Sequence, residues 1–434
     1  MSIQVARELY IPASGRAVTE LREHNYLSYD GLNRRETRWF ESQSDTADYY
    51  EHRDSPDNGR TWGEWVREHA TSKVTVGNDE HEMQGYSNAR NVWNPVHRHS
   101  LTLKLHRLYL DGYRNATDRY WNDGMHFVDH VFLEITNEAR TETVRQMAAY
   151  EDGITEFDEK TYRQEAFLER NLGVGCSLYV MKNGDILFDV EAPVAYCCKK
   201  TGHDLEKVFP STGKLGHAKG LMICRGRWNA QIGRYDLSFS EPMYLSDCQS
   251  SRGIDEPTIA ELDSGKILVV MRTSTMLRYN WESRMSPYAP GYKYYSISDD
   301  GGKTFSPPMP WHFDSREVVY SSATYSTLLR SRANGKLYWI GNYTDPVKIH
   351  DNYPRYPLQI VEVDEEWGCA KKETLAVIDT RRDGEPEVVQ LSNFSIIENR
   401  ETGNFELYLS KYGQFKPERH VFDCESWKYT ITLE

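Results

Sequence analysis

The sequence predicts an all-β fold, a six-bladed β-propeller of four-stranded antiparallel blades, with seven blades as the alternative. Apolar strand–turn–strand units recur at intervals of roughly 45–70 residues. The turn sequence Ser-x-Asp-x-Gly-x-Thr-aromatic occurs twice, at Ser55–Trp62 and Ser298–Phe305. Aromatic residues make up 12% of the chain, with 29 Tyr and 11 Trp, which favours many short, half-buried strands over a helical bundle.

The expected elements follow in chain order. Ile3–Tyr10 is a strand that could close the ring, and the first blade is expected at about 24–65. Residues 66–170 are the least regular part, with strands around His97, His99 and His106, a strand from His126 to Ile135, and a partly helical insertion at 136–172. Four further blades are expected at about 176–245, 255–308, 319–370 and 389–434, so that 1–434 form a single domain.

The stretch Asp255–Thr273 carries the first candidate site residues. Its two apolar runs are joined by an Asp-Ser-Gly turn, which is a hairpin signal. Glu256 opens the first strand and Arg272 closes the second, so antiparallel pairing brings both side chains to the same end of the sheet. The alternative is an ordinary salt bridge at a strand end, which contributes little when exposed.

Together with the turn at Ser298–Phe305, this hairpin resembles one blade of the sialidase superfamily, in which that turn is the Asp-box of the BNR repeat. Sialidases of this kind hold the substrate carboxylate with three arginines, use a tyrosine assisted by a glutamate as nucleophile, and use an aspartate as general acid. The resemblance implies that Glu256 is the glutamate, Arg272 the second arginine and Arg355, in NYPRYPLQ, the third. Arginine suits this role because its guanidinium pairs bidentately with a carboxylate.

The chain departs from the family at the nucleophile. Phe394, in SNFSII, occupies the position where the family has its tyrosine, and phenylalanine has no oxygen with which to form a covalent intermediate. The first arginine also has a poor match, around Arg22. The general acid is expected in the loop QSDTADYY, at Asp48 or Asp45. The resemblance therefore implies the family's architecture more strongly than its mechanism.

Three functions remain open at this point. The first is an exo-acting glycoside hydrolase that acts on a uronic or nonulosonic acid with an activated water. The second is a lyase that cleaves a uronate linkage by β-elimination, for which a histidine or tyrosine would abstract the proton. The third is a glycan-binding propeller without catalysis. His126 and His130 lie on one face of a predicted strand. The full set of histidine and tyrosine candidates is His97, His99, His126, His130, Tyr320 and Tyr325.

Composition limits the partners. The net charge of −13 argues against nucleic acid or an anionic membrane as the main partner, but it does not forbid an anionic ligand. The resemblance to sialidases implies an acidic oligo- or polysaccharide as the partner, and a homo-oligomer is left open. No cofactor is expected; a structural metal at Cys197 and Cys198 with His203 is the weaker alternative to buried thiols. The first residues lack the apolar core of a signal peptide, which predicts a cytoplasmic protein, or a secreted or periplasmic one if the chain has been trimmed.

Overall fold

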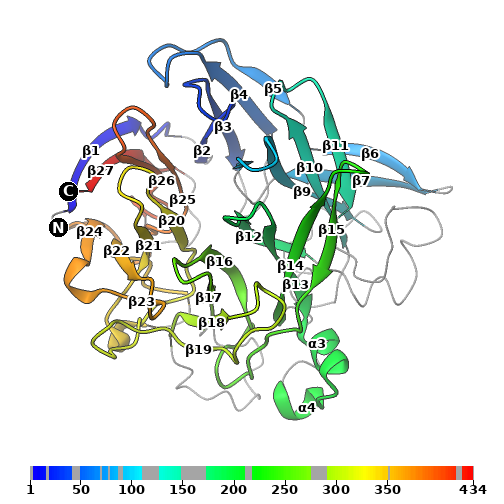
Figure 1. Ribbon diagram of the computed structural model, residues 1–434. Helices are drawn as coiled ribbons and strands as arrows, with labels where there is room; N and C mark the ends of the chain where they lie inside the picture. The colour runs from blue at the N-terminus through cyan, green and yellow to red at the C-terminus, as the bar shows by residue number, and fades with distance from the viewer. Residues whose placement is uncertain are drawn as a thin grey trace. The chain divides into compact units, whose positions relative to one another are not determined.

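The computed structural model contains six antiparallel sheets, which are the blades of a six-blade β-propeller (Figure 1). The prediction of six blades is confirmed. The structure describes residues 3–15, 19–41, 49–68, 71–76, 79–86, 91–109, 127–147, 173–210, 218–274, 291–349, 352–416 and 423–433. These form two compact units: unit 1 is 1–70, 291–293 and 310–434, and unit 2 is 71–290 and 294–309. That 1–434 form one domain stays a prediction.

Unit 1 contains three blades, numbered here by their order in the chain. Blade 1 has the order β2 (Thr19–Tyr26), β3 (Arg34–Glu41), β4 (Tyr49–Ser55), β5 (Val66–Glu68). Blade 5 has the order β20 (Thr327–Arg330), β21 (Leu337–Asn342), β22 (Leu358–Asp364), β23 (Cys369–Ala370), with β24 (Ala376–Asp379) also paired to β22 and the short 3₁₀ turns η3 (Pro346–Lys348) and η4 (Lys372–Thr374) in its loops. Blade 6 has the order β1 (Ile3–Ile11), β27 (Ser426–Leu433), β26 (Phe405–Ser410), β25 (Phe394–Glu398). The N-terminal strand β1 thus completes a sheet made otherwise from the C-terminus, as the sequence predicts.

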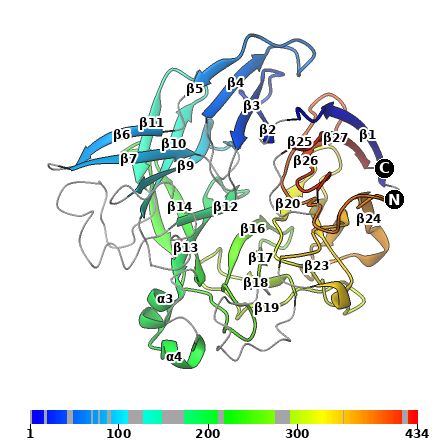
Figure 2. The same ribbon diagram turned by 180° about the vertical axis from the view of Figure 1, so that it is seen from behind.

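Unit 2 contains the other three sheets. Blade 2 has the order β11 (Thr143–Met147), β10 (Phe127–Asn137), β9 (His99–Tyr109), β7 (Asp79–Tyr86), β6 (Thr71–Val76), with β8 (Val92–Asn94) paired to β9. Blade 3 has the order β12 (Gly173–Val180), β13 (Ile186–Pro193), β14 (Lys219–Asn229), β15 (Arg234–Phe239). Blade 4 has the order β16 (Asp255–Glu261), β17 (Ile267–Arg272), β18 (Tyr294–Ser298), β19 (Met309–Pro310). The short helix α3 (Val194–Thr201) lies next to β13, and α4 (Leu205–Val208) lies next to α3 (Figures 1 and 2).

The helical insertion predicted at 136–172 is wrong where the structure describes it. β10 extends to Asn137, and Thr143–Met147 form β11, paired antiparallel with Thr136–Phe132. Val144 of β11 packs against the apolar core of blades 2 and 3. Pairing and burial therefore outweigh the weak helix preference of TVRQM. Residues 148–172 lie outside the described residues.

The repeated turn sequence produces the same local structure in both units. In blade 4, Asp300 accepts hydrogen bonds from the backbone and the hydroxyl of Thr304, at 3.0 and 2.7 Å, and Ser298 accepts one from Gly302 N at 2.9 Å. In blade 1, Asp57 accepts the same two bonds from Thr61, at 2.8 and 2.7 Å. The hydrogen bonds from Thr61 hold the pKa of Asp57 down to about 2. Ser, Asp and Thr thus satisfy the backbone donors of a tight turn.

The hairpin of blade 4 forms as the sequence predicts. Gly265 has φ of 80°, a left-handed conformation that glycine adopts without a Cβ penalty, and its N–H donates to Leu262 O at 2.9 Å. β17 has the burial pattern of a central strand, since Ile267–Met271 are buried and only Arg272 at its end is partly exposed. Among the described residues, no helix has the length and apolar character to cross a membrane.

Candidate functional site

Glu256 and Arg272 meet at one end of blade 4. Asp255 is opposite Arg272 in the ladder, and a bulge separates Asp255 from Thr258, which turns Glu256 out of the regular register. One Glu256 carboxylate oxygen lies 2.5 Å from Arg272 Nη1. The Glu256 side chain is 28% exposed and that of Arg272 is 12% exposed, so the pair is neither fully buried nor free in solvent. The pairing predicted from the hairpin is present.

Glu256 has an unusual backbone conformation. Its φ is 36°, in the left-handed region that few residues other than glycine adopt. Its N–H donates to a carboxylate oxygen of Glu191 at 3.0 Å. Backbone strain of this kind costs roughly 1–3 kcal/mol and persists where the surroundings hold it, often at functional sites.

Glu191 lies near the end of β13, in blade 3, and its carboxyl group shares a donor with that of Asp255: Glu256 N donates to Glu191 Oε1 at 3.0 Å and to Asp255 Oδ1 at 3.2 Å. Lys219, at the start of β14, contacts both carboxyl groups and lies 3.5 Å from Asp255. Burial raises the pKa of Glu191 to about 8 against the opposing charge of Lys219. Burial also acts to raise the pKa of Asp255, but Lys219, Arg272 and Arg252 outweigh it, so the pKa of Asp255 lies below its usual range. We call Glu191, Lys219, Arg252, Asp255, Glu256 and Arg272 the carboxyl cluster.

Sequence reasoning missed Glu191 and Lys219. The available signal was the run ILFDVEAP, in which Asp189 and Glu191 stand two apart in an otherwise apolar strand and so share one face of it. A buried strand places an acid on its buried face only where a partner is present. The partner could not be identified from the sequence, because Asp255 is 64 residues away from Glu191 and belongs to another blade.

Arg355 lies in unit 1, just before β22. Its Nη1 donates to Gln390 Oε1 at 2.7 Å, and its Nε donates to Asn352 O at 3.2 Å. Arg355 and Arg272 belong to different units, so their convergence on one carboxylate stays a prediction.

Phe394 begins β25 and is 9% exposed. Its ring centroid lies 5.2 Å from that of Tyr325, which stands two residues before β20. Phe394 has no hydroxyl group, and the ring that packs against it, that of Tyr325, carries one. The catalytic role expected of Tyr325 stays a prediction.

A cavity of about 520 Å³ lies beside the Arg355 loop in blade 5. Its lining includes Tyr343 and Thr344, which follow β21, and Tyr356 and Pro357, which precede β22.

His99 lies in blade 2 and is 4% exposed. Its Nε2 is 2.7 Å from the hydroxyl of Tyr235, and its ring packs against Trp228 at a centroid distance of 4.6 Å. Burial lowers the pKa of His99 to about 4, so it is a neutral member of an aromatic cluster at pH 7. These contacts favour a structural role.

The remaining predicted site residues are two histidines and two aspartates. Asp48, Asp45 and His126 lie outside the described residues. His130 is in β10, opposite His106 of β9 in the ladder. Their proposed roles stay predictions.

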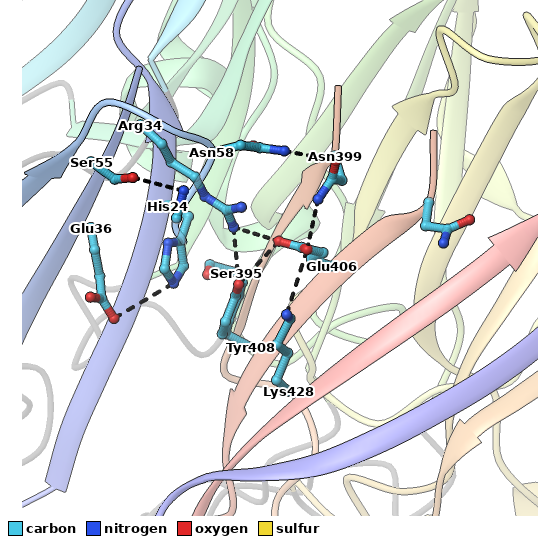
Figure 3. Close-up of polar contacts among 12 residues, drawn as sticks. His24, Arg34, Glu36, Ser55, Asn58, Ser395, Asn399, Glu406, Tyr408 and Lys428 are labelled. Carbon is cyan, nitrogen blue, oxygen red and sulfur yellow. Dashed lines mark hydrogen bonds and ion pairs between the residues drawn. The ribbon is translucent and has the colours of Figure 1, made fainter. Parts of the chain in front are cut away.

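A second buried polar cluster lies between blades 1 and 6 of unit 1 (Figure 3). Glu36 accepts hydrogen bonds from Tyr10, Arg22 and Arg53 at 2.6, 2.7 and 2.6 Å, and its side chain is fully buried. Arg34 pairs with Glu406 at 2.6 Å and donates to the hydroxyl of Tyr408 at 2.9 Å. We call this set the ionic cluster.

His24 lies within the ionic cluster, with its ring stacked on that of Tyr408 at a centroid distance of 3.9 Å. Burial, followed by the charges of Arg34 and Arg22, holds the pKa of His24 well below its usual range. His24 is therefore neutral at pH 7, although Glu36 is 3.7 Å from its Nε2.

The cysteines considered for a metal site are buried. Cys197 and Cys198 lie in α3, and burial raises the pKa of the Cys197 thiol to about 12. Within the described part of the chain, no group of three or more His, Cys, Asp or Glu side chains could hold a metal ion.

No protein-family model matches this chain, and no curated protein matches its sequence. Solved structures do resemble it. A protein of unknown function from Dyadobacter fermentans is 12% identical, with 99% of each chain covered and a TM-score of 0.59. The sialidase NanB from Streptococcus pneumoniae is 11% identical, with 97% of this chain and 70% of that one covered and a TM-score of 0.54.

Trypanosoma rangeli sialidase is 10% identical to this chain, with a TM-score of 0.53. The alignment covers 98% of this chain and 59% of the trypanosomal chain. At these identities the likeness shows the fold alone. The chain has the sialidase-like β-propeller fold predicted from its sequence.

Proposed function

We propose that this protein is a carbohydrate-active enzyme, an exo-acting glycoside hydrolase on a glycan that carries a carboxylate, such as a uronic or nonulosonic acid. The observation that carries the proposal is Glu256: a non-glycine residue held at φ 36° and paired with Arg272 at the end of blade 4. Strain supported by a buried carboxyl group is typical of a site that has to present one side chain in one direction.

Arg272 is the proposed contact to the substrate carboxylate, as the second of the three arginines, and Arg355 is proposed as the third. A guanidinium forms two parallel hydrogen bonds with a carboxylate, which fixes the sugar as well as binding it. Gln390 already accepts a hydrogen bond from Arg355 Nη1. The Arg355 side chain is therefore partly fixed before a ligand binds, and binding costs less conformational entropy.

The proposed route does not use a nucleophile at position 394. The Trypanosoma rangeli sialidase structure with 2,3-difluorosialic acid is described as a covalent intermediate. Phe394 has no oxygen for such a bond, so we propose direct attack by water, which inverts the anomeric carbon. A covalent sugar adduct on Tyr325, detected by mass spectrometry after treatment with a fluorinated sialic acid, would contradict this route.

The test is digestion of a panel of acidic glycosides with the full chain. Hydrolysis releases reducing ends without ultraviolet absorbance, whereas elimination produces an unsaturated, absorbing sugar. Release of neither product would contradict an enzymatic function. The stereochemistry of the first product, followed by NMR, separates inversion from retention.

Arg272→Ala is expected to lower kcat/KM by at least 100-fold, because a largely desolvated charge partner of the substrate is removed. The matched control is Arg330→Ala, which removes a comparable arginine–carboxylate pair, Arg330 with Glu365 at 2.5 Å, from blade 5. We expect that control to keep its activity. Equal losses in both variants would contradict the assignment of Arg272.

A further inference from the structure

Glu256 differs from the other described non-glycine residues that have a positive φ. Four of the five such residues lie in turns or bends, namely Asn58, Arg98, Arg140 and Arg316. Among the residues that the structure describes, only Glu256 has this conformation inside a strand, β16. A strand residue keeps such a conformation only where contacts outside its own ladder hold it.

The contacts around Glu256 come from blade 3. Glu256 stands outside the paired register of β16 and β17, so its N–H needs an acceptor elsewhere. Glu191 Oε1 accepts it at 3.0 Å, and the neighbouring Asp255 accepts it at 3.2 Å. On the other side, the buried hydroxyl of Ser177 donates to Pro257 O at 2.8 Å. Two strands of blade 3 thus hold the peptide groups on either side of the Glu256 side chain.

The segment before Glu256 is also fixed to blade 3. Lys219, at the start of β14, donates its N–H to Arg252 O at 3.0 Å and accepts from Ile254 N at 2.8 Å. Gly253 has φ of 73°, and a Cβ there would lie 2.0 Å from Lys219 O. A larger residue would therefore push the two segments apart. Arg252, Ile254 and Glu256 each direct a backbone group at blade 3.

Lys219 holds the acceptor as well as the backbone. Its Nζ contacts Glu191 Oε2, whereas Oε1 accepts from Glu256 N. The two oxygens of one carboxyl group therefore join β14 to the strained residue. The Glu191 side chain is 4% exposed, and that of Lys219 is 39% exposed. Glu191 is thus shielded from a ligand, and its effect on the site would act through Glu256.

We propose that Glu191 is a positioning residue: by accepting from Glu256 N, it fixes the backbone conformation that directs the Glu256 side chain toward Arg272 and the substrate. Lys219 holds Glu191 in the orientation that this requires. The inference rests on the proposed function, in which the site is built on Glu256 and Arg272. It gives a residue of blade 3 a role in the chemistry at the end of blade 4.

The direction of the Glu256 side chain depends on this acceptor. Without it, the backbone at Glu256 can return to an ordinary strand conformation, which has the lower energy for any residue other than glycine. The carboxylate would then leave its place beside Arg272. A misplacement of about 1 Å can cost roughly 100-fold in rate. Binding of the substrate carboxylate should change less, because Arg272 lies on a different strand, β17.

Two double variants separate the acceptor from the charges. Glu191→Gln with Lys219→Met removes both charges and keeps an oxygen that can accept from Glu256 N. Glu191→Leu with Lys219→Met removes the same charges and the acceptor, with a side chain of similar size. We expect kcat of the leucine variant to be at least about tenfold below that of the glutamine variant, with KM values within about threefold of each other.

A control measures the cost of losing any buried pair of this kind. Glu362→Leu with Lys371→Met removes a buried glutamate and a lysine that lies 2.6 Å from it, in blade 5 of unit 1. Its kcat should stay within about threefold of the wild-type value. Equal kcat values in the two Glu191 double variants would overturn the proposal, as would a difference that lies in KM alone.

A readout without substrate decides the matter if the leucine variant does not fold. In the wild-type chain labelled with nitrogen-15 glutamate, the Glu256 amide proton should lie downfield and exchange slowly, because it is bonded to a carboxyl oxygen. The peak is assigned by its loss in Glu256→Ala. Lys219→Met, which frees Glu191 from β14, should move this peak and leave that of Glu261, at the far end of β16, in place. A Glu256 amide with an ordinary shift and rapid exchange would contradict the proposal.

Failure of the proposed function is distinguishable from failure of this inference. If the wild-type chain cleaves no acidic glycoside, the hydrolase is wrong, and the Glu256 amide still shows whether Glu191 holds this residue. If the wild-type chain is active and the two Glu191 double variants have equal kcat, the hydrolase stands and the positioning role is wrong.

Discussion

Strand β26 separates two kinds of packing in unit 1. Its odd-numbered residues Phe405, Leu407 and Leu409 belong to the apolar core that joins blades 5 and 6. Its even-numbered residues Glu406 and Tyr408 face blade 1 and the ionic cluster. The period of two in FELYLS thus gives one strand an apolar face and a charged one.

The two faces of β26 show that equally buried residues do not tolerate substitution equally. Leu407 and Glu36 are both fully buried. When an apolar side chain in a core is shortened, the folded state loses stability in proportion to the buried surface removed and the cavity left behind. A buried ion pair contributes little net stability when intact, but loss of one partner leaves an uncompensated charge. The blade 1–blade 6 packing should therefore be the less tolerant of single changes.

The largest expected effect is that of Glu36→Ala. It leaves Arg22 and Arg53 without their carboxylate, and removes the acceptor of the Tyr10 hydroxyl. We expect a loss of about 3–5 kcal/mol in the free energy of unfolding, measured by urea denaturation. Asp54→Ala is the control, because the Asp54 carboxylate is 46% exposed and its pair with Arg35 should contribute about 1 kcal/mol or less. Similar losses in both variants would contradict the comparison.

On the apolar face, Leu407→Ala should cost about 3 kcal/mol through lost burial and the cavity that remains. The matched variant is Val377→Ala on β24, because Val377 is 53% exposed and should lose almost nothing. Differential scanning calorimetry of the two variants and the wild type gives both values. A loss for Leu407→Ala larger than that for Glu36→Ala would reverse the expected order.

The ionic cluster should also make stability depend on pH. The pKa of His24 is lower in the folded chain than in the unfolded one, so below about pH 6.5 only the unfolded state binds this proton. Stability is then lost as the pH falls, by up to about 1.4 kcal/mol per unit, or about 2 kcal/mol between pH 6.5 and 5.

His24→Phe keeps a ring for the stack on Tyr408 and removes the titration. The difference in urea-unfolding free energy between pH 7 and pH 5 should therefore be smaller in this variant than in the wild type. The contributions of the other titrating groups to this difference are the same in both chains and cancel when the two chains are compared. A wild type that gains stability relative to the variant at pH 5 would mean that Glu36 draws a proton onto His24 in the folded state.

The architecture could be predicted because its signals are local. The Asp-Ser-Gly turn with Gly265 at φ 80°, and the two turns built on Asp57 and Asp300, each specify their structure within a few residues. The strand at Thr143–Met147 could not, because its partner Phe132–Thr136 and the core under Val144 decide its conformation. Its own residues carry only a weak helix preference.

The candidate site also contains a part that could be predicted from local sequence and a part that could not. Glu256 and Arg272 follow from one hairpin, since pairing across a short turn sets which residues meet. Glu191 reaches the backbone N–H of Glu256 only because blades 3 and 4 pack together, as Glu36 meets Tyr10 only because blades 1 and 6 do. Contacts between blades depend on long-range geometry, which turn chemistry and alternation do not encode.

The last and smallest expected effect concerns the pair between Arg34 and Glu406, which are 2.6 Å apart and join blades 1 and 6. Each of Arg34→Met and Glu406→Leu alone should be strongly destabilising, because it leaves the other charge buried. The double variant removes both charges of this pair, so its loss should be smaller than the sum of the two single losses by about 1–3 kcal/mol. It should not reach wild-type stability, because Tyr408 donates to Glu406 at 3.1 Å and would lose that acceptor. A double-mutant cycle by urea denaturation measures the coupling. Strictly additive losses would mean that the two side chains contribute through packing, as Leu407 does, and that the two faces of β26 are less different than their residues indicate.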